Sequence, residues 1–379
     1  KQTRFDVRGG VTFDSGLIDR LSGSLSVVDY EHTEFEEPGE PATLFENKGF
    51  EARIEAEHVN LAGFTGSFGV QGSRRDFSAL GAEAFLSPTV TQQWGVFVFE
   101  TYERGEWGME GGLRYDEVRL DNLLADARTF DTLNASLGWH AHVSEHLFVG
   151  ASISRTERAP TDVELYADGP HLATRQYEIG DAGLSTEKGV NIEARATWKK
   201  GPLEIGGSVY RFVFDDFIYL APTGEEDESL PVFAATQADA TFTGAEATLA
   251  LALGEVLGAA WRTDASLDVV RGELDGGGNL PRIPPMSATV GVEARWARAS
   301  ARLEARWADA QDRVAAYELP TDGYTTIGLR VNMTLTDRVD LVLEGVNLTD
   351  GEVRVHASPL KDVAPLGGRG GRVALRARF

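Results

Sequence analysis

Apolar and polar residues alternate with a period of two along most of the chain. In residues 189–198 the apolar side chains occupy every second position, and polar or charged side chains fill the positions between them. The same pattern recurs in residues 50–57, 287–296 and 372–379. Because successive side chains of a β-strand point to opposite faces, this period predicts strands with one apolar and one polar face.

These alternating segments are long for a soluble protein. They run for about 10 to 14 residues, which is the length that a tilted strand needs to cross a bilayer, whereas ordinary strands are about half as long. Membrane barrels carry aromatic girdles near the ends of their strands, and tryptophans occur at such places here: Trp94, Trp107, Trp139, Trp198, Trp261, Trp296 and Trp307. The sequence therefore predicts strands whose apolar face meets lipid and whose polar face meets water.

Short and long connections alternate between the segments. The short ones are residues 14–19, 60–63, 103–106, 144–145, 199–202, 297–300 and 336–338. The long ones are residues 33–47, 74–91, 119–129, 156–186, 221–240, 272–285, 311–323 and 349–368. Such an alternation is typical of outer-membrane barrels, and the fold expected is an all-β, transmembrane antiparallel β-barrel. We count about 17 strands; because bacterial single-chain barrels have an even number, we expect strands to be missing at the front.

Composition narrows the function further. The net charge is −23, with 59 acidic and 36 basic side chains, which argues against a nucleic-acid partner because phosphates need basic surface. The absence of cysteine excludes disulfides and thiolate chemistry. No signal-peptide segment occurs at Lys1 to Arg4, so we expect a processed chain or a fragment. The sequence contains no nucleophile elbow, zinc-protease motif or phosphate-binding loop, and no enzymatic activity is expected.

Several short motifs stand out against this pattern. The clearest is R-A-P followed by E-L-Y, and G-P-H-L-A-T follows it directly. The residues that carry the motifs are Arg158, Ala159, Pro160, Glu164, Leu165, Tyr166, Gly169, Pro170, Asn347, Leu348 and the terminal Phe379. They resemble the TonB-dependent outer-membrane receptors, the 22-stranded active importers of scarce metals, siderophores, haem and cobalamin. The G-P-H-L-A-T stretch is similar to the branch that includes zinc-uptake receptors.

This resemblance implies a Gram-negative outer-membrane protein that imports a metal ion or metal complex, with zinc favoured. Residues 1–379 would form part of the barrel, without the plug domain and the first strands. The implied partners are outer-membrane lipid, the TonB energy-coupling complex acting through the plug, and the barrel-assembly machinery acting on the strand that ends at Phe379. A siderophore or haem receptor, a passive porin-like channel and a non-transporting adhesion or assembly barrel remain alternatives.

Histidines are the natural metal candidates in a chain without cysteine. His171 lies in the long loop that resembles the zinc-type receptors, and Asp168 and Glu178 lie near it in the sequence. A zinc site needs about four ligands, so we expect others from the plug or another loop. These residues could instead only order the loop. His140 and His142 are expected to be solvated side chains on a polar strand face. No resident cofactor is expected.

Overall fold

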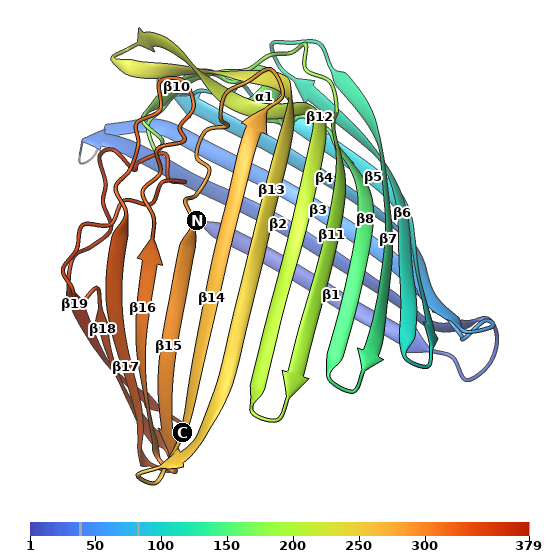
Figure 1. Ribbon diagram of the computed structural model, residues 1–379. Helices are drawn as coiled ribbons and strands as arrows, with labels where there is room; N and C mark the ends of the chain where they lie inside the picture. Colours follow the sequence, from blue (N-terminus) through green and yellow to red (C-terminus); the bar gives the residue numbers. More distant parts are fainter. Residues whose placement is uncertain (38–39, 82–83, 379) are drawn as a thin grey trace. The chain divides into compact units, whose positions relative to one another are not determined.

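The computed structural model describes residues 1–37, 40–81 and 84–378, and within them the chain is almost entirely strand (Figure 1). These described residues form nineteen strands and one short helix, so the all-β expectation is confirmed. Seventeen of the strands are long, in agreement with the count from the sequence; the other two, β9 and β10, have four residues each. None of the described helical residues forms a helix long and apolar enough to cross a membrane.

The first elements are β1 (Gln2–Thr12), β2 (Ile18–Glu37), β3 (Glu40–His58), β4 (Phe64–Gly81), β5 (Thr89–Arg104), β6 (Trp107–Asn122), β7 (Arg128–Ser144), β8 (Leu147–Arg158), α1 (Asp162–Tyr166), β9 (Asp168–His171) and β10 (Gln176–Ile179). The remaining elements are β11 (Glu187–Lys200), β12 (Leu203–Asp227), β13 (Leu230–Val256), β14 (Ala259–Leu274), β15 (Ser287–Trp296), β16 (Ala299–Ala308), β17 (Tyr324–Thr336), β18 (Val339–Val346) and β19 (Gly370–Ala377).

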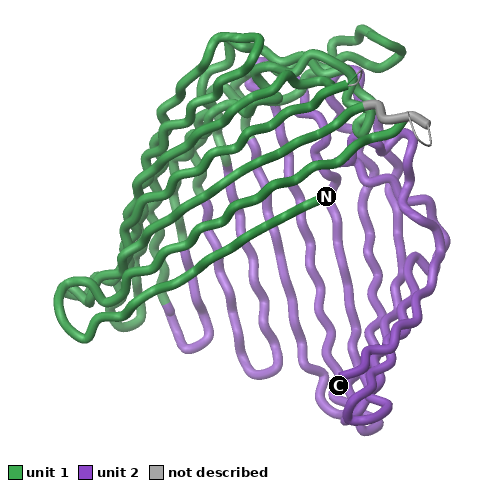
Figure 2. The backbone as a smooth tube through the Cα atoms, turned by 180° about the vertical axis from the view of Figure 1, so that it is seen from behind, with its two compact units in different colours: residues 1–141, 151–192, 212–241 green, residues 142–150, 193–211, 242–379 purple. Residues whose placement is uncertain are grey.

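The chain divides into two compact units (Figure 2). Unit 1 comprises Lys1–Ala141, Ala151–Ile192 and Phe212–Thr241, and unit 2 comprises His142–Gly150, Glu193–Arg211 and Phe242–Phe379. Within unit 1, β1 to β7 pair antiparallel, each with the next along the chain. Within unit 2, β14 to β19 pair in the same way.

Apolar side chains of the unit 1 strands gather on one face of the sheet and stay exposed. Ile54 of β3 lies opposite Val70 of β4, which lies opposite Val96 of β5, and all three are about half exposed. Soluble proteins rarely leave such a continuous apolar surface uncovered. This face therefore has the character of a lipid-facing wall, as the alternation predicts.

Two groups of aromatic side chains mark the limits of that face on β5 and β6. Trp94 packs edge-on against Tyr115 with ring centroids 5.6 Å apart, and Tyr102 lies 5.7 Å from Trp107. Trp94 and Tyr102 are eight residues apart on one strand, or about 26 Å along it. With the usual tilt of barrel strands this corresponds to a height of roughly 20 Å, close to that of the apolar band of outer-membrane barrels.

In unit 2, charged side chains on the polar face of β14 and β16 form a network. Arg302 of β16 donates to Asp264 of β14 at 2.7 and 2.8 Å and to Glu304 at 2.9 Å. The guanidinium occupies the space where a side chain on Gly291 of β15 would lie, which explains the glycine. β15 begins at Ser287 as predicted, because prolines at 284 and 285 have no N–H to extend the ladder.

Four of the predicted long connections are mostly strand, and this corrects their expected bounds: β4 and β5 take up most of 74–91, and β6 and β7 take up most of 119–129. The largest differences are at 33–47 and 221–240. β2 runs to Glu37 and β3 begins at Glu40, inside the connection predicted at 33–47. Likewise β12 runs to Asp227 and β13 begins at Leu230, inside the connection predicted at 221–240. The regular alternation of apolar and polar residues stops near these positions, but the ladder continues because it is formed by backbone groups and does not require an alternating pattern of side chains.

Candidate metal site

The connection between β8 and β11, residues 159–186, carries most of the motif residues, and we call it the motif loop. Arg158 at the end of β8 anchors it by donating four hydrogen bonds, at 2.8 and 3.0 Å to Glu164 and at 3.1 and 3.0 Å to Glu187. Glu164 belongs to α1 and Glu187 is the first residue of β11. One guanidinium therefore ties the start of the loop to its helix and to its end, since its planar fork can serve two carboxylates.

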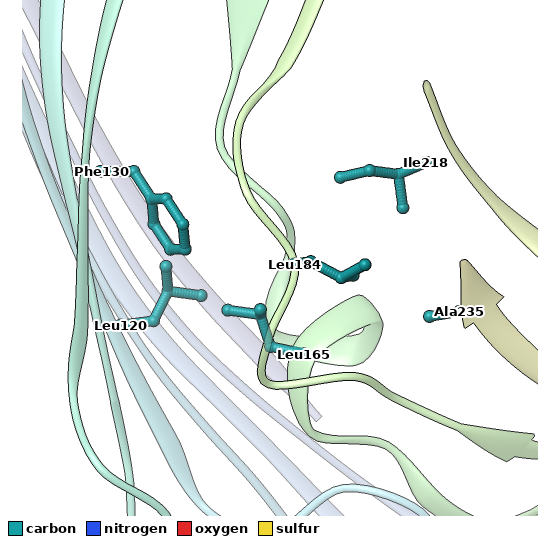
Figure 3. Packing of buried hydrophobic residues seen from close by; sticks show 6 residues of the cluster. All are labelled: Leu120, Phe130, Leu165, Leu184, Ile218 and Ala235. Carbon is teal, nitrogen blue, oxygen red and sulfur yellow. The ribbon is translucent and has the colours of Figure 1, made fainter. Parts of the chain in front are cut away.

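A small apolar core holds the motif loop from within. Leu165 on α1 and Leu184 pack with wall residues, and all members are at most 6% exposed (Figure 3). The cluster is Leu120, Phe130, Leu165, Leu184, Ile218 and Ala235, with Ala159 and Tyr166 packed against it. Helix α1 is short but capped, because Thr161 and Glu164 form a capping box. Pro160 beside it is fully buried.

Glycine permits two close backbone approaches around the hairpin of β9 and β10. A Cβ atom on Gly169 would lie 2.9 Å from the Cα of Phe85, and one on Gly180 would lie 2.6 Å from the backbone N of Tyr166. Phe85 also forms a buried cluster with Leu86 and Ala167. The motif glycine at 169 thus lets the hairpin lie directly against the segment before β5.

The hairpin brings two of the three predicted metal residues together. The Nδ1 of His171 lies 2.8 Å from the Oε1 of Glu178, which also accepts a hydrogen bond from the Thr174 hydroxyl at 3.3 Å. The imidazole is stacked on the ring of Phe85, with centroids 4.5 Å apart and planes 6° from parallel. The side chain of His171 is 32% exposed, whereas that of Glu178 is 4% exposed.

Asp168 does not join this pair. It lies opposite Ile179 in the hairpin, while Glu178 lies opposite Gly169, so Asp168 and Glu178 point to opposite faces. The Asp168 carboxylate instead accepts a hydrogen bond from the Tyr177 hydroxyl at 3.3 Å. Burial, followed by the nearby Asp168 carboxylate, raises the pKa of Tyr177. In the described part of the chain, no three His, Asp or Glu side chains are grouped closely enough to hold a metal ion.

The other residues singled out in the sequence have structural positions. Asn347 adopts a positive φ of 45° and bonds the backbone of Gly351, so it shapes the turn after β18. Leu348 follows it and is 37% exposed. Pro170 lies opposite Tyr177 in the hairpin. His140 lies 3.3 Å from a carboxylate oxygen of Glu103, and the terminal Phe379 lies outside the described residues.

Unit 2 contains a buried polar centre around His356 and Glu318 that the sequence does not predict. The side chain of His356 is 1% exposed, its Nδ1 lies 2.9 Å from the Thr321 hydroxyl, and its Nε2 lies 3.2 Å from Glu318. The carboxylate of Glu318 also accepts backbone N–H bonds from Ala315 and Arg282 at 3.0 and 2.9 Å. Burial raises the pKa of Glu318, but the hydrogen bond with His356 and the two backbone donors together outweigh it, and the net shift of this pKa is downward.

This centre joins three of the long connections in unit 2. Glu318 lies between β16 and β17, Arg282 between β14 and β15, and His356 between β18 and β19. Nearby, the buried ammonium of Lys361 donates to the Leu319 carbonyl at 2.5 Å. A lone histidine in a polar loop gives no sequence signal of such burial.

Residues 2–348 match the family model described as "TonB dependent receptor-like, beta-barrel". Among solved structures, the chain is similar to the copper transporter OprC, with 18% identity and a TM-score of 0.86. It is also similar to the FrpB iron transporter of Neisseria meningitidis, with 15% identity and a TM-score of 0.78, and to the ferric enterobactin receptor PfeA of Pseudomonas aeruginosa, with 16% and 0.72.

Each of these likenesses covers 100% of this chain but only 65%, 63% and 62% of the respective structures, so the chain spans less than two thirds of their length. At such identities the structures show the shared fold, while the family match covers most of the sequence. The chain therefore belongs to the TonB-dependent receptor β-barrel family, whose members are β-barrels of the bacterial outer membrane.

Proposed function

We propose that the chain is the barrel portion of a receptor that imports a scarce metal ion or metal complex across the outer membrane with energy from the TonB system. The substrate contact is made in the motif loop through His171, and a divalent cation such as zinc is the favoured cargo. The complete receptor also has a plug domain, through which the energy is coupled.

One observation carries the choice of a metal: a partly exposed imidazole, His171, is fixed in position by the buried Glu178 in a long loop of the barrel. Neutral imidazole is a good ligand for zinc, copper, iron and nickel. The G-P-H-L-A-T sequence around this residue agrees with a metal cargo, and two of the structurally similar proteins are a copper transporter and an iron transporter. Asp168, which faces the other way, is left out of the proposed contact.

The test uses the full-length receptor in its natural membrane. Cells that express it should accumulate radioactive zinc only while the proton gradient is intact, and the His171→Ala variant should lose that uptake. Asp168→Asn serves as the matched control on the same hairpin and should retain it. Uptake that continues after a protonophore is added would instead indicate a passive channel, and equal uptake by His171→Ala would remove the proposed contact.

A siderophore or haem cargo is distinguished by competition. Zinc binding to the purified full-length receptor should be unaffected by an iron-loaded catecholate or by haem if the cargo is the divalent ion. Displacement of zinc by either compound would indicate that the cargo is a siderophore or haem.

A further inference from the structure

Glu178 is the least exposed of the three residues expected to bind metal. It is 3% exposed as a residue, and its Oε1 accepts from the His171 ring and from the Thr174 hydroxyl. A carboxylate that is itself a metal ligand needs an oxygen open to the incoming ion. Here the oxygen that faces the imidazole is already used by donors of the same hairpin.

The Glu178 contact determines which nitrogen of His171 carries the proton. A carboxylate oxygen can only accept a hydrogen bond, so the Nδ1 at 2.8 Å is the donor. In the neutral ring the other nitrogen, Nε2, then has a free lone pair. No hydrogen bond to this Nε2 occurs among the described residues, and the side chain is about one third exposed.

Phe85 fixes the plane of the ring. Its aromatic ring is stacked on the imidazole with planes only 6° from parallel, and the close approach at Gly169 holds the hairpin against this segment. The imidazole is thus held by a flat contact on one face and a hydrogen bond at one edge. The free Nε2 is left with a defined direction.

The charge of the pair favours a cation over an anion. Burying a carboxylate is costly unless charge or hydrogen bonds compensate for it, and Glu178 has one imidazole N–H and one hydroxyl as its donors. A metal ion on Nε2 would make the Nδ1–H a stronger donor to the same oxygen. An anion at Nε2 would face a proton acceptor backed by a carboxylate.

We propose that Glu178 is a positioning residue that fixes the His171 tautomer, so that Nε2 is presented as the single ligand atom of this hairpin to a metal cation. The proposal rests on the proposed function, and it changes the role of Glu178 from ligand to orienting partner. Loss of such an outer partner typically lowers metal affinity by about 10- to 100-fold.

The test measures zinc affinity and ring chemistry separately in the purified full-length receptor. Glu178→Gln has the same size, but its amide can either accept from Nδ1 or donate to it, so the tautomer of His171 is no longer fixed. We expect zinc to bind about 10- to 100-fold more weakly. In the metal-free protein, carbethoxylation of His171 by diethyl pyrocarbonate, followed by mass spectrometry, should slow because Nε2 then carries the proton in part of the molecules. Asp168→Asn should leave both readouts unchanged.

The outcomes separate this proposal from the proposed function. If His171→Ala abolishes zinc binding while Glu178→Gln retains full affinity, the positioning role is overturned and the metal contact stands. If His171→Ala binds zinc normally, both are overturned. Weaker binding by Glu178→Gln supports the proposal when carbethoxylation slows and hydrogen exchange of residues 168–179 is unchanged. Weaker binding with the original carbethoxylation rate, or with faster hydrogen exchange of these residues, overturns it.

Discussion

Replacing Arg158 with methionine should loosen the motif loop while leaving the barrel wall intact. The substitution removes four hydrogen bonds of 2.8 to 3.1 Å and leaves the carboxylates of Glu164 and Glu187, 19% and 10% exposed, without their cation. Breaking a fully buried ion pair costs about 3–5 kcal/mol. Because the Arg158 side chain is 38% exposed, water screens part of this, and we expect about 2–3 kcal/mol.

Hydrogen exchange of the full-length receptor in detergent measures this cost locally. At about 1.4 kcal/mol for each factor of ten, protected amides in residues 159–187 should exchange roughly 30- to 150-fold faster through local opening. Arg369→Met is the matched control, because Arg369 and Asp350 are 61% and 54% exposed and 3.4 Å apart. Such a surface pair contributes about 1 kcal/mol or less, so exchange around it should change by only a few-fold.

A triple variant tests the cause of the loss. Adding Glu164→Gln and Glu187→Gln to Arg158→Met removes the uncompensated charges, while the amide oxygens can still accept from the backbone of residues 161 and 218. Replacing a complete set of partners is often close to neutral, so most of the protection should return. If Arg158→Met changes exchange no more than Arg369→Met does, the anchoring role of Arg158 is refuted.

Three further substitutions probe other contacts. Leu165→Ala removes a core side chain that is 2% exposed and should destabilise the motif loop by about 2–5 kcal/mol, measured by the same exchange assay; an unchanged rate would contradict the packing in Figure 3. Gly180→Ala places a Cβ 2.6 Å from the backbone of Tyr166 and should cost about 1–3 kcal/mol, read as faster proteolysis within residues 159–186. The lowered pKa of Glu318 stabilises the joined loops above its unfolded-state value of about 4.3, and this contribution is lost as the pH falls through the folded pKa. Glu318→Gln should therefore make protection of residues 309–323 independent of pH between about 5 and 3; an unchanged pH profile would assign the effect to another group.

The wall could be predicted from the sequence because one physical cause governs it. Apolar and polar side chains must alternate along a strand between lipid and water. The alternation in residues 287–296 therefore predicts a strand with the bounds that β15 has. This requirement applies only to the part of a strand that lies between lipid and water. Beyond that part, the ladders of β2 with β3 and of β12 with β13 continue. Their side chains meet loop contacts as well as water, as Ala235 of β13 does in the core of the motif loop, so no regular alternation reveals these strand ends.

The candidate site could be predicted only in part, because its contacts join distant positions. Arg158 and Glu187 are 29 residues apart, and nothing in their spacing indicates that one guanidinium serves both ends of the loop. Asp168 is a different case. It stands three positions before His171, so a strand through both places them on opposite faces. Residues 168–171 carry no strand signal in the sequence, and this rule becomes usable only when the hairpin is known.

The motif loop contains residues that build a platform and one residue, His171, that we propose meets the ligand. Arg158 fixes both ends of the motif loop, Leu165 fills its core, and Gly169 lets the hairpin reach Phe85. His171 presents a ring nitrogen, Nε2, that has no hydrogen bond among the described residues. Because a displacement of about an ångström is enough to spoil a coordination geometry, platform substitutions should weaken metal binding without touching the metal. Affinity losses should then follow losses of amide protection for the platform variants, whereas His171→Ala should lose affinity with protection intact.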